Sequence, residues 1–179
     1  MEDLEEKYLP NLLELYNTNN FEKVIQKANE LVDKYPKSHV LRNILGSAHS
    51  GLQQYQKAID AYKIAIQIKP DYAECYNNLG IAERKMHRVS EALDSFDKAI
   101  LYDPNNAKAF VNLGNLKNSN REYSEALSLY KNALSKDPNL VEALHNMGYV
   151  YLKKSEINLA INNLKKAIKI GRASCRERV

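Results

Sequence analysis

Three asparagines recur at one spacing along the chain, and their side chains could hold the backbone of a ligand. Asn78, Asn112 and Asn146 are 34 residues apart, and each precedes a glycine by two positions. A carboxamide donates and accepts hydrogen bonds at once, so one such side chain can hold a backbone N–H and a backbone C=O together. The series therefore predicts binding of an extended peptide, provided that the three amides lie along one surface.

Residues with catalytic or metal-binding chemistry are few and scattered. Cys75 falls among apolar positions, where we expect a packed thiol, and no base can be placed beside it for nucleophilic catalysis. The four histidines form no His-x-x-x-His pair and lack a carboxylate arrangement suited to a metal ion. The sequence also contains no glycine-rich phosphate loop. We therefore predict a protein that is not an enzyme and that requires no cofactor or metal.

Charge and hydropathy exclude two further classes of partner. The 179 residues carry 26 basic and 22 acidic side chains, which interleave as on a solvated helical surface rather than forming a basic stripe for nucleic acid. The cluster Arg84, Lys85, His87 and Arg88 could meet a phosphate or an acidic partner, but it is more typical of a solvated turn. No apolar run approaches the roughly 18–20 residues that span a bilayer, and the acidic start MEDLEEKYLP is unlike a secretion signal. We predict a cytoplasmic protein that binds neither nucleic acid nor membrane.

The elements that must position the asparagines follow from the same period, because several residue types repeat every 34 positions. These series are Pro36, Pro70, Pro104 and Pro138; Gly46, Gly80, Gly114 and Gly148; Ala58, Ala92, Ala126 and Ala160; Ala65, Ala99, Ala133 and Ala167; Leu45, Leu79, Leu113 and Met147; and Tyr62, Phe96 and Tyr130, followed by Leu164. Independent series do not share one period by chance. The chain is therefore predicted to be a repeat protein.

Each unit is predicted to form two helices. In residues 73–106, small or apolar residues recur at helical spacing on both sides of the interruption MHRVS. Ser90 occupies an N-cap or first-turn position of the second helix, and Pro104 ends that helix because proline disfavours helical geometry in the residue before it. Gly80 costs about 1 kcal/mol inside a helix, and we expect a close approach of the paired helix near Ala92 to compensate for it.

The period, together with its Leu-Gly, Ala, aromatic and Pro positions, resembles the tetratricopeptide repeat (TPR) from about residue 5 to residue 169. The resemblance implies an all-α fold, a right-handed α-solenoid of about ten antiparallel helices, with the first helix of each pair lining the concave face. We predict a single array, 1–169, of five repeats near 5–38, 39–72, 73–106, 107–140 and 141–169. The first is degenerate, with Asn11 and Leu12 in place of Leu-Gly, as expected of a cap.

The resemblance also gives the asparagines a setting, because superhelical TPR proteins, including the arm of O-linked N-acetylglucosamine transferases, carry a similar asparagine ladder. Ile44 and Pro10 interrupt the series in repeats 2 and 1, so it covers three repeats of five. The alternative is that these amides bridge neighbouring helices. Further candidates for the peptide-binding groove are Asn77, Ile81, Lys108, Val111, Asn115, His145 and Tyr149.

A second binding mode of similar proteins, the carboxylate clamp for chaperone tails, does not fit. The clamp needs Lys and Asn from one repeat, Asn from the next, and Lys and Arg from a third, but here Asn78 and Lys108 alone match. A site without the other three groups lacks most of the charge that a pair of carboxylates requires. Chaperone-tail binding is therefore not expected.

The last ten residues, IGRASCRERV, interrupt the repeat. Proline is due at position 172, where Arg172 stands, and the segment resembles the translation of a sequencing adapter. We therefore predict that residues 170–179 are a non-native tail and leave them out of the functional argument.

Three functions are compatible with these features. The first is a non-catalytic scaffold that binds an extended peptide or protein segment through the concave groove. The second is the N-terminal, substrate-recruiting arm of a larger enzyme of glycosyltransferase, sulfotransferase or methyltransferase type. The third is self-association, in which the exposed last helix of repeat 5 stacks on another copy of the chain.

Overall fold

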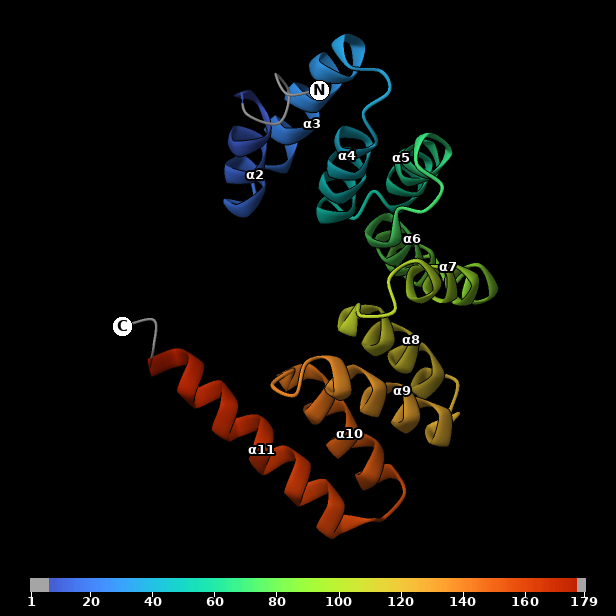
Figure 1. Ribbon diagram of the computed structural model, residues 1–179, viewed down its shortest axis with the longest axis vertical. Helices are drawn as coiled ribbons and strands as arrows, with labels where there is room; N and C mark the ends of the chain where they lie inside the picture. Colours follow the sequence, from blue (N-terminus) through green and yellow to red (C-terminus); the bar gives the residue numbers. More distant parts are fainter. Residues whose placement is uncertain (1–6, 177–179) are drawn as a thin grey trace. The chain divides into compact units, whose positions relative to one another are not determined.

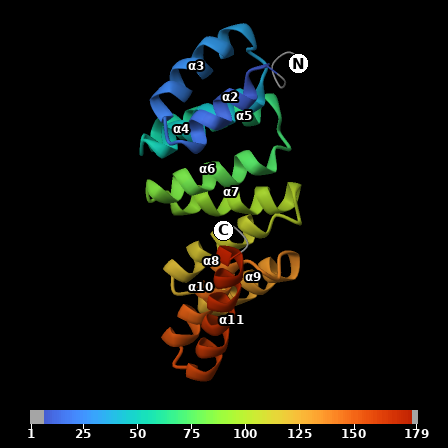
Figure 2. The ribbon, with the colours of Figure 1, turned by 90° about the vertical axis from the view of Figure 1, so that its left-hand side faces the viewer.

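The computed structural model describes the backbone of residues 7–176 and the side chains through residue 173, and this part of the chain is helical, without strands (Figure 1). The helices are α2 (Leu9–Asn17), α3 (Phe21–Lys34), α4 (His39–Gly51), α5 (Tyr55–Ile68), α6 (Ala73–Lys85), α7 (Val89–Tyr102), α8 (Ala107–Ser119), α9 (Tyr123–Lys136), α10 (Val141–Lys153) and α11 (Ile157–Arg176). Consecutive helices pair as antiparallel hairpins, as α6 and α7 do in Figure 2. The predicted all-α fold of paired helices is confirmed. The first repeat was predicted to begin near residue 5, and residues 5 and 6 lie outside the described part.

The turn inside each described hairpin has the same geometry. The residue two positions before the second helix has a positive φ, although none of the five is glycine: Asn19 (57°), Gln53 (58°), His87 (59°), Arg121 (64°) and Ser155 (60°). The following N–H bonds a carbonyl five residues back, as in Gln54 N to His49 O at 2.9 Å, which closes the helix with a Schellman motif. The sequence analysis missed this feature because no glycine marks it.

The second helices end where the prolines require. Helices α5, α7 and α9 each have 14 residues and stop two residues before a proline. Helix α11 runs for 20 residues, because Arg172 at the position of the missing proline permits the helix to continue. Ser90 lies in the first turn of α7, within the predicted range.

The repeated glycine lies against the aromatic ring of the partner helix. A Cβ built on Gly80 would come 2.7 Å from Cε1 of Phe96, and a Cβ on Gly114 would come 2.6 Å from Cε1 of Tyr130. The predicted close approach is present. The three atoms nearest a Cβ at Gly80 belong to Phe96, and at Gly148 the carbonyl oxygen of Ala160, the residue equivalent to Ala92, lies 3.4 Å from the built Cβ. The ring lies 16 residues after the glycine, and it fills the space that a methyl group would otherwise occupy.

The chain divides into two compact units. Unit 1, Met1–Tyr102, contains α2 to α7, and unit 2, Asp103–Val179, contains α8 to α11. In unit 1, a cluster around Leu12, Val24 and Leu41 holds the first hairpin on α4, and a cluster around Ile59 and Leu79 joins α5 to α6. In unit 2, a single cluster joins α8, α9, α10 and α11. The arrangement of all repeats as one continuous array remains a prediction.

Candidate functional site

The three asparagines of the series lie at equivalent places on the first helices. Asn78 lies on α6 in unit 1, while Asn112 on α8 and Asn146 on α10 lie in unit 2. Each is half-buried, between the buried core face and the exposed face of its helix. This placement results from the helical period, because each asparagine immediately precedes a buried Leu or Met and stands two residues before the glycine that packs on the partner helix.

In unit 1, Asn78 lines a pocket of about 270 Å³. Its walls are Tyr16, Ser47, Ser50, Gly51, Tyr62, Asn78 and Ile81. The hydroxyl groups of Ser47 and Tyr62 lie 3.2 Å apart and form a hydrogen bond. The walls therefore offer hydroxyl and amide groups but no charged side chain, so the pocket suits neutral polar groups such as those of a peptide backbone.

The amide of Asn78 also bridges two repeats. Its Nδ2 donates to Asn43 Oδ1 at 3.1 Å, and Asn43 Nδ2 in turn donates to the Tyr72 hydroxyl at 3.3 Å and to Glu74 Oε1 at 3.4 Å. Asn43 is buried, with 5% of its surface exposed, so this network needs an internal acceptor for each donor. The bridging role that the sequence left open is therefore present at Asn78, and it uses one of the two N–H groups of that amide.

A similar bridge occurs in unit 2 with different partners. Asn146 Nδ2 donates to Asn115 Oδ1 at 2.7 Å, and the Tyr130 hydroxyl donates to the same oxygen at 2.8 Å. Asn115 Nδ2 donates to Glu142 Oε1 at 3.3 Å. Asn115 and Asn146, both predicted as groove residues, are thus brought together, and their amides are oriented by the fold before any ligand arrives.

The other predicted groove residues differ in their exposure. Lys108, His145 and Tyr149 are exposed, and Ile81 lines the unit 1 pocket. Asn77 and Val111 are buried, with 8% and 1% of their surfaces exposed, because both lie on the part of the first helix that faces the core. Their side chains are therefore not available to a ligand. The sequence reasoning missed Ser50 and Tyr16, which line the same pocket and stand six positions after the asparagine row in their repeats.

The titratable groups of unit 1 have structural surroundings. Burial raises the pKa of the Cys75 thiol to about 12, and its Sγ lies 3.5 Å from the carbonyl of Tyr62. Burial also raises the pKa of Glu83, whose Oε2 accepts a hydrogen bond of 2.7 Å from Ser95 Oγ. In the basic cluster, Arg88 donates to Gln56 at 2.6 Å. Across the described residues, no three His, Cys, Asp or Glu side chains gather as metal ligands would.

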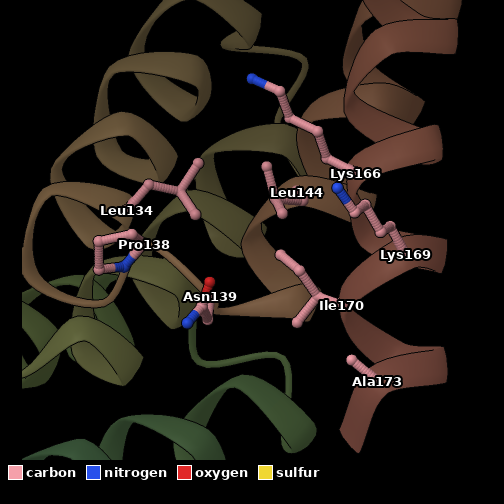
Figure 3. Close-up of a pocket in the computed structure, with 8 residues that line it drawn as sticks. All are labelled: Leu134, Pro138, Asn139, Leu144, Lys166, Lys169, Ile170 and Ala173. Atoms are coloured by element: carbon pink, nitrogen blue, oxygen red, sulfur yellow. The ribbon is translucent and has the colours of Figure 1, made fainter.

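A larger cavity of about 540 Å³ lies in unit 2 between α9, α10 and α11 (Figure 3). Leu134, Pro138 and Leu144 line one side, and Lys166 and Lys169 stand on the opposite side with Ile170. Part of its wall is formed by Ile170 and Ala173, which belong to the segment that resembles an adapter translation. We therefore do not assign the functional site to this cavity.

Stacked helical hairpins with polar amides on the first helices define a helical-repeat protein. Models of the tetratricopeptide repeat match residues 73–106, 95–128 and 141–172, and a TPR repeat model matches 46–86 and 118–155. The matches together extend from residue 46 to residue 172, and the chain belongs to the tetratricopeptide-repeat family.

Solved structures agree with this fold. A crystal structure of MamA aligns with a TM-score of 0.78 at 22% identity, covering 91% of this chain and 95% of that one. MamA from Desulfovibrio magneticus RS-1, residue 41 to the end, aligns with a TM-score of 0.78 at 16% identity, covering 93% and 94%. YrrB, described as a TPR protein with an unusual peptide-binding site, aligns with a TM-score of 0.68 at 21% identity, covering 94% and 90%. Comparison with curated proteins gives no match.

Each helix between residues 7 and 176 is too short or too polar to cross a lipid bilayer.

Proposed function

We propose that this protein is a non-catalytic scaffold that binds an extended peptide or protein segment along its first helices. The observation that carries the proposal is the pocket beside Asn78, whose walls include amide and hydroxyl groups but no charged side chain. An extended peptide presents one N–H and one C=O per residue, and such groups match donors and acceptors of this kind. YrrB, a protein of the same fold, is likewise described as having a peptide-binding site.

The internal hydrogen bonds favour this function because they fix the amides in place. Asn78 uses one N–H to bond Asn43, which leaves its second N–H and its carbonyl oxygen for a ligand. Asn146 Nδ2 is held by Asn115 Oδ1, and Asn146 Oδ1 lies 3.4 Å from His145 Nδ1. Side chains that are ordered before binding lose less rotamer entropy when the ligand arrives. Exposed Lys108, His145 and Tyr149 would supply contacts to the side chains of the ligand in unit 2.

A neutral pocket disfavours the binding of acidic tails. Two carboxylates in the unit 1 pocket would lose water without gaining a cation, because no Lys or Arg lines it. A peptide bound there is expected to place a neutral residue in the pocket. Binding through backbone groups also implies modest sequence selectivity.

The test is peptide capture by the full chain on an array of random peptides. The triple variant Asn78→Ala, Asn112→Ala and Asn146→Ala should keep its helicity by circular dichroism but capture fewer peptides. The matched control replaces three exposed asparagines of the second helices, Asn29, Asn132 and Asn162, with alanine. Undiminished capture by a folded triple variant, or an equal loss in the control, would contradict the proposal.

A further inference from the structure

One wall of the unit 1 pocket comes from the first, degenerate repeat. Tyr16 lies on α2, whereas the remaining lining residues lie on α4, α5 and α6. Tyr16 and Ser50 are 34 residues apart, so they occupy the same position in repeats 1 and 2. The repeat that the sequence predicts as a cap therefore contributes an aromatic side chain to the pocket that Asn78 lines.

The ring of Tyr16 is held in place by a second ring that lies on a glycine. It meets the ring of Phe21 edge to face, with the centroids 5.3 Å apart and the planes at 67°. Phe21 in turn lies against Gly51, where a built Cβ would come 2.7 Å from Cε2 and Cζ of the ring. The side chains at the position of Gly51 in repeats 3, 4 and 5 are Lys85, Ser119 and Lys153. The half-buried Tyr16 ring is therefore oriented before any ligand arrives, which lowers the entropy lost on binding.

Hydroxyl groups form the polar part of the pocket. The Ser47 and Tyr62 hydroxyls are hydrogen-bonded at 3.2 Å, and Ser50 adds a third hydroxyl to the lining. Burial raises the pKa of Tyr62, and the nearby Tyr16 adds to the rise. A hydroxyl both donates and accepts hydrogen bonds, so this part of the pocket can pair with a hydroxyl of a ligand. The apolar part of the lining is the Tyr16 ring together with Ile81.

These two kinds of lining match a neutral aromatic side chain with a polar tip. The pocket volume of about 270 Å³ equals that of roughly nine molecules of liquid water, which is enough for a phenol ring. A carboxylate would lose its water without meeting a cation, and an aliphatic side chain would displace water from the hydroxyls without replacing its hydrogen bonds. Tyrosine suits both parts, because its ring covers the apolar wall while its hydroxyl takes the place of water.

On the basis of the peptide binding proposed above, we propose that the unit 1 pocket binds a tyrosine side chain of the extended segment and that Tyr16 determines this specificity. The ring of the bound tyrosine packs on Tyr16, and its hydroxyl forms a hydrogen bond with Ser47. The amide of Asn78 holds the backbone of the segment beside that tyrosine. Repeat 1 is then part of the binding surface, and it selects the ligand.

The probes are short fluorescein-labelled peptides of serine, threonine and asparagine that differ in one central residue: tyrosine, phenylalanine, leucine or glutamate. Their binding to the full chain is followed by fluorescence anisotropy. The tyrosine peptide should bind about tenfold more tightly than the leucine peptide, as a ring pair and one hydrogen bond provide. The phenylalanine peptide should fall between these two, and the glutamate peptide should bind most weakly.

The variants separate the ring from the hydroxyl. Tyr16→Leu should weaken the tyrosine peptide about fivefold and the leucine peptide less, whereas Tyr16→Phe, which keeps the ring, should bind as the unaltered chain does. Ser47→Ala should remove the preference for tyrosine over phenylalanine without weakening the phenylalanine peptide. The matched control is Tyr102→Leu, which should change nothing, because Tyr102 stacks on Tyr76 with the centroids 5.5 Å apart but does not line the pocket.

Circular dichroism of each variant verifies the fold. Binding without a preference for tyrosine that the triple asparagine variant loses would overturn the tyrosine pocket and leave the proposed function intact. The absence of binding by every peptide would overturn both. An equal effect of Tyr16→Leu and Tyr102→Leu, or of Tyr16→Leu and Tyr16→Phe, would overturn the role of the Tyr16 ring.

Discussion

Replacing Gly80 with alanine tests the packing that defines the repeat. A helix ordinarily gains about 1 kcal/mol from this substitution, because glycine is the more flexible residue in the unfolded chain. Here the new Cβ would lie 2.7, 2.8 and 3.0 Å from three atoms of the Phe96 ring. Ordinary contact begins at 3.4 Å, so ring and helix must separate by several tenths of an ångström.

The neighbours of Phe96 oppose that separation. The ring is fully buried. Overpacking of a filled core costs about 1–3 kcal/mol, which exceeds or cancels the gain of about 1 kcal/mol in helix propensity. We expect Gly80→Ala to lower the free energy of unfolding by about 1 kcal/mol. Gly148→Ala is the comparison, because its Cβ meets Leu164, a flexible and half-buried side chain. That substitution should be neutral or slightly stabilising.

The assay is urea unfolding followed by circular dichroism on both variants and on the pair Gly80→Ala with Phe96→Leu. Leucine reproduces the combination found in repeat 5, so the double variant should lose less stability than the two single losses added together. If Gly80→Ala stabilised the chain as an open helical site would, the ring would not be the reason for the glycine. Strict additivity in the double variant would refute the same reasoning.

Three other substitutions test local features. Gln53→Gly should stabilise the chain by about 1 kcal/mol in urea unfolding by relieving the positive φ, and Gln53→Ala, which retains a Cβ, should not. Glu83→Gln should stabilise the chain at neutral pH, because burial disfavours the ionised carboxyl. This gain in stability should vanish as the pH falls through the range where the carboxyl protonates. Glu83→Ala should destabilise the chain, because it leaves Ser95 Oγ without its acceptor. In a Cys175→Ser variant, Cys75 should react with a disulfide reagent at a rate set by opening of the fold, so mild urea should accelerate the reaction steeply.

The sequence alone was sufficient for the fold because the repeat supplies several independent markers of each hairpin. Proline ends α5, α7 and α9, and the glycine and aromatic series set how closely the two helices approach. The turn geometry was not foreseen, since a positive φ at Gln53 or Arg121 contradicts the local preference of those residues. It is imposed by the hairpin, whose packing offsets the strain.

The sequence placed the candidate asparagines on the first helices but did not predict their hydrogen bonds. The 34-residue series placed Asn78 and Asn146 on equivalent helices, but their partners, Asn43 and Asn115, lie at different repeat positions. Those partners depend on which neighbouring side chain reaches the amide, which the period does not determine. Asn77 and Val111 were misplaced for a related reason, because one helical step turns a side chain from the surface into the core.

The core of each hairpin helps to set the polarity of the first-helix surface. Where the ring on the second helix is tyrosine, the residue fifteen positions earlier bonds its hydroxyl, as Ser47 does for Tyr62 and Asn115 for Tyr130. Where the ring is Phe96, which has no hydroxyl, the same position is Ile81. A buried tyrosine needs a hydrogen-bond partner, and that partner must stand at the edge of the core, on the surface that carries the asparagines. In repeats 2, 3 and 4 the side chain at this position beside the amide row is therefore polar where the core ring is tyrosine and apolar where it is phenylalanine.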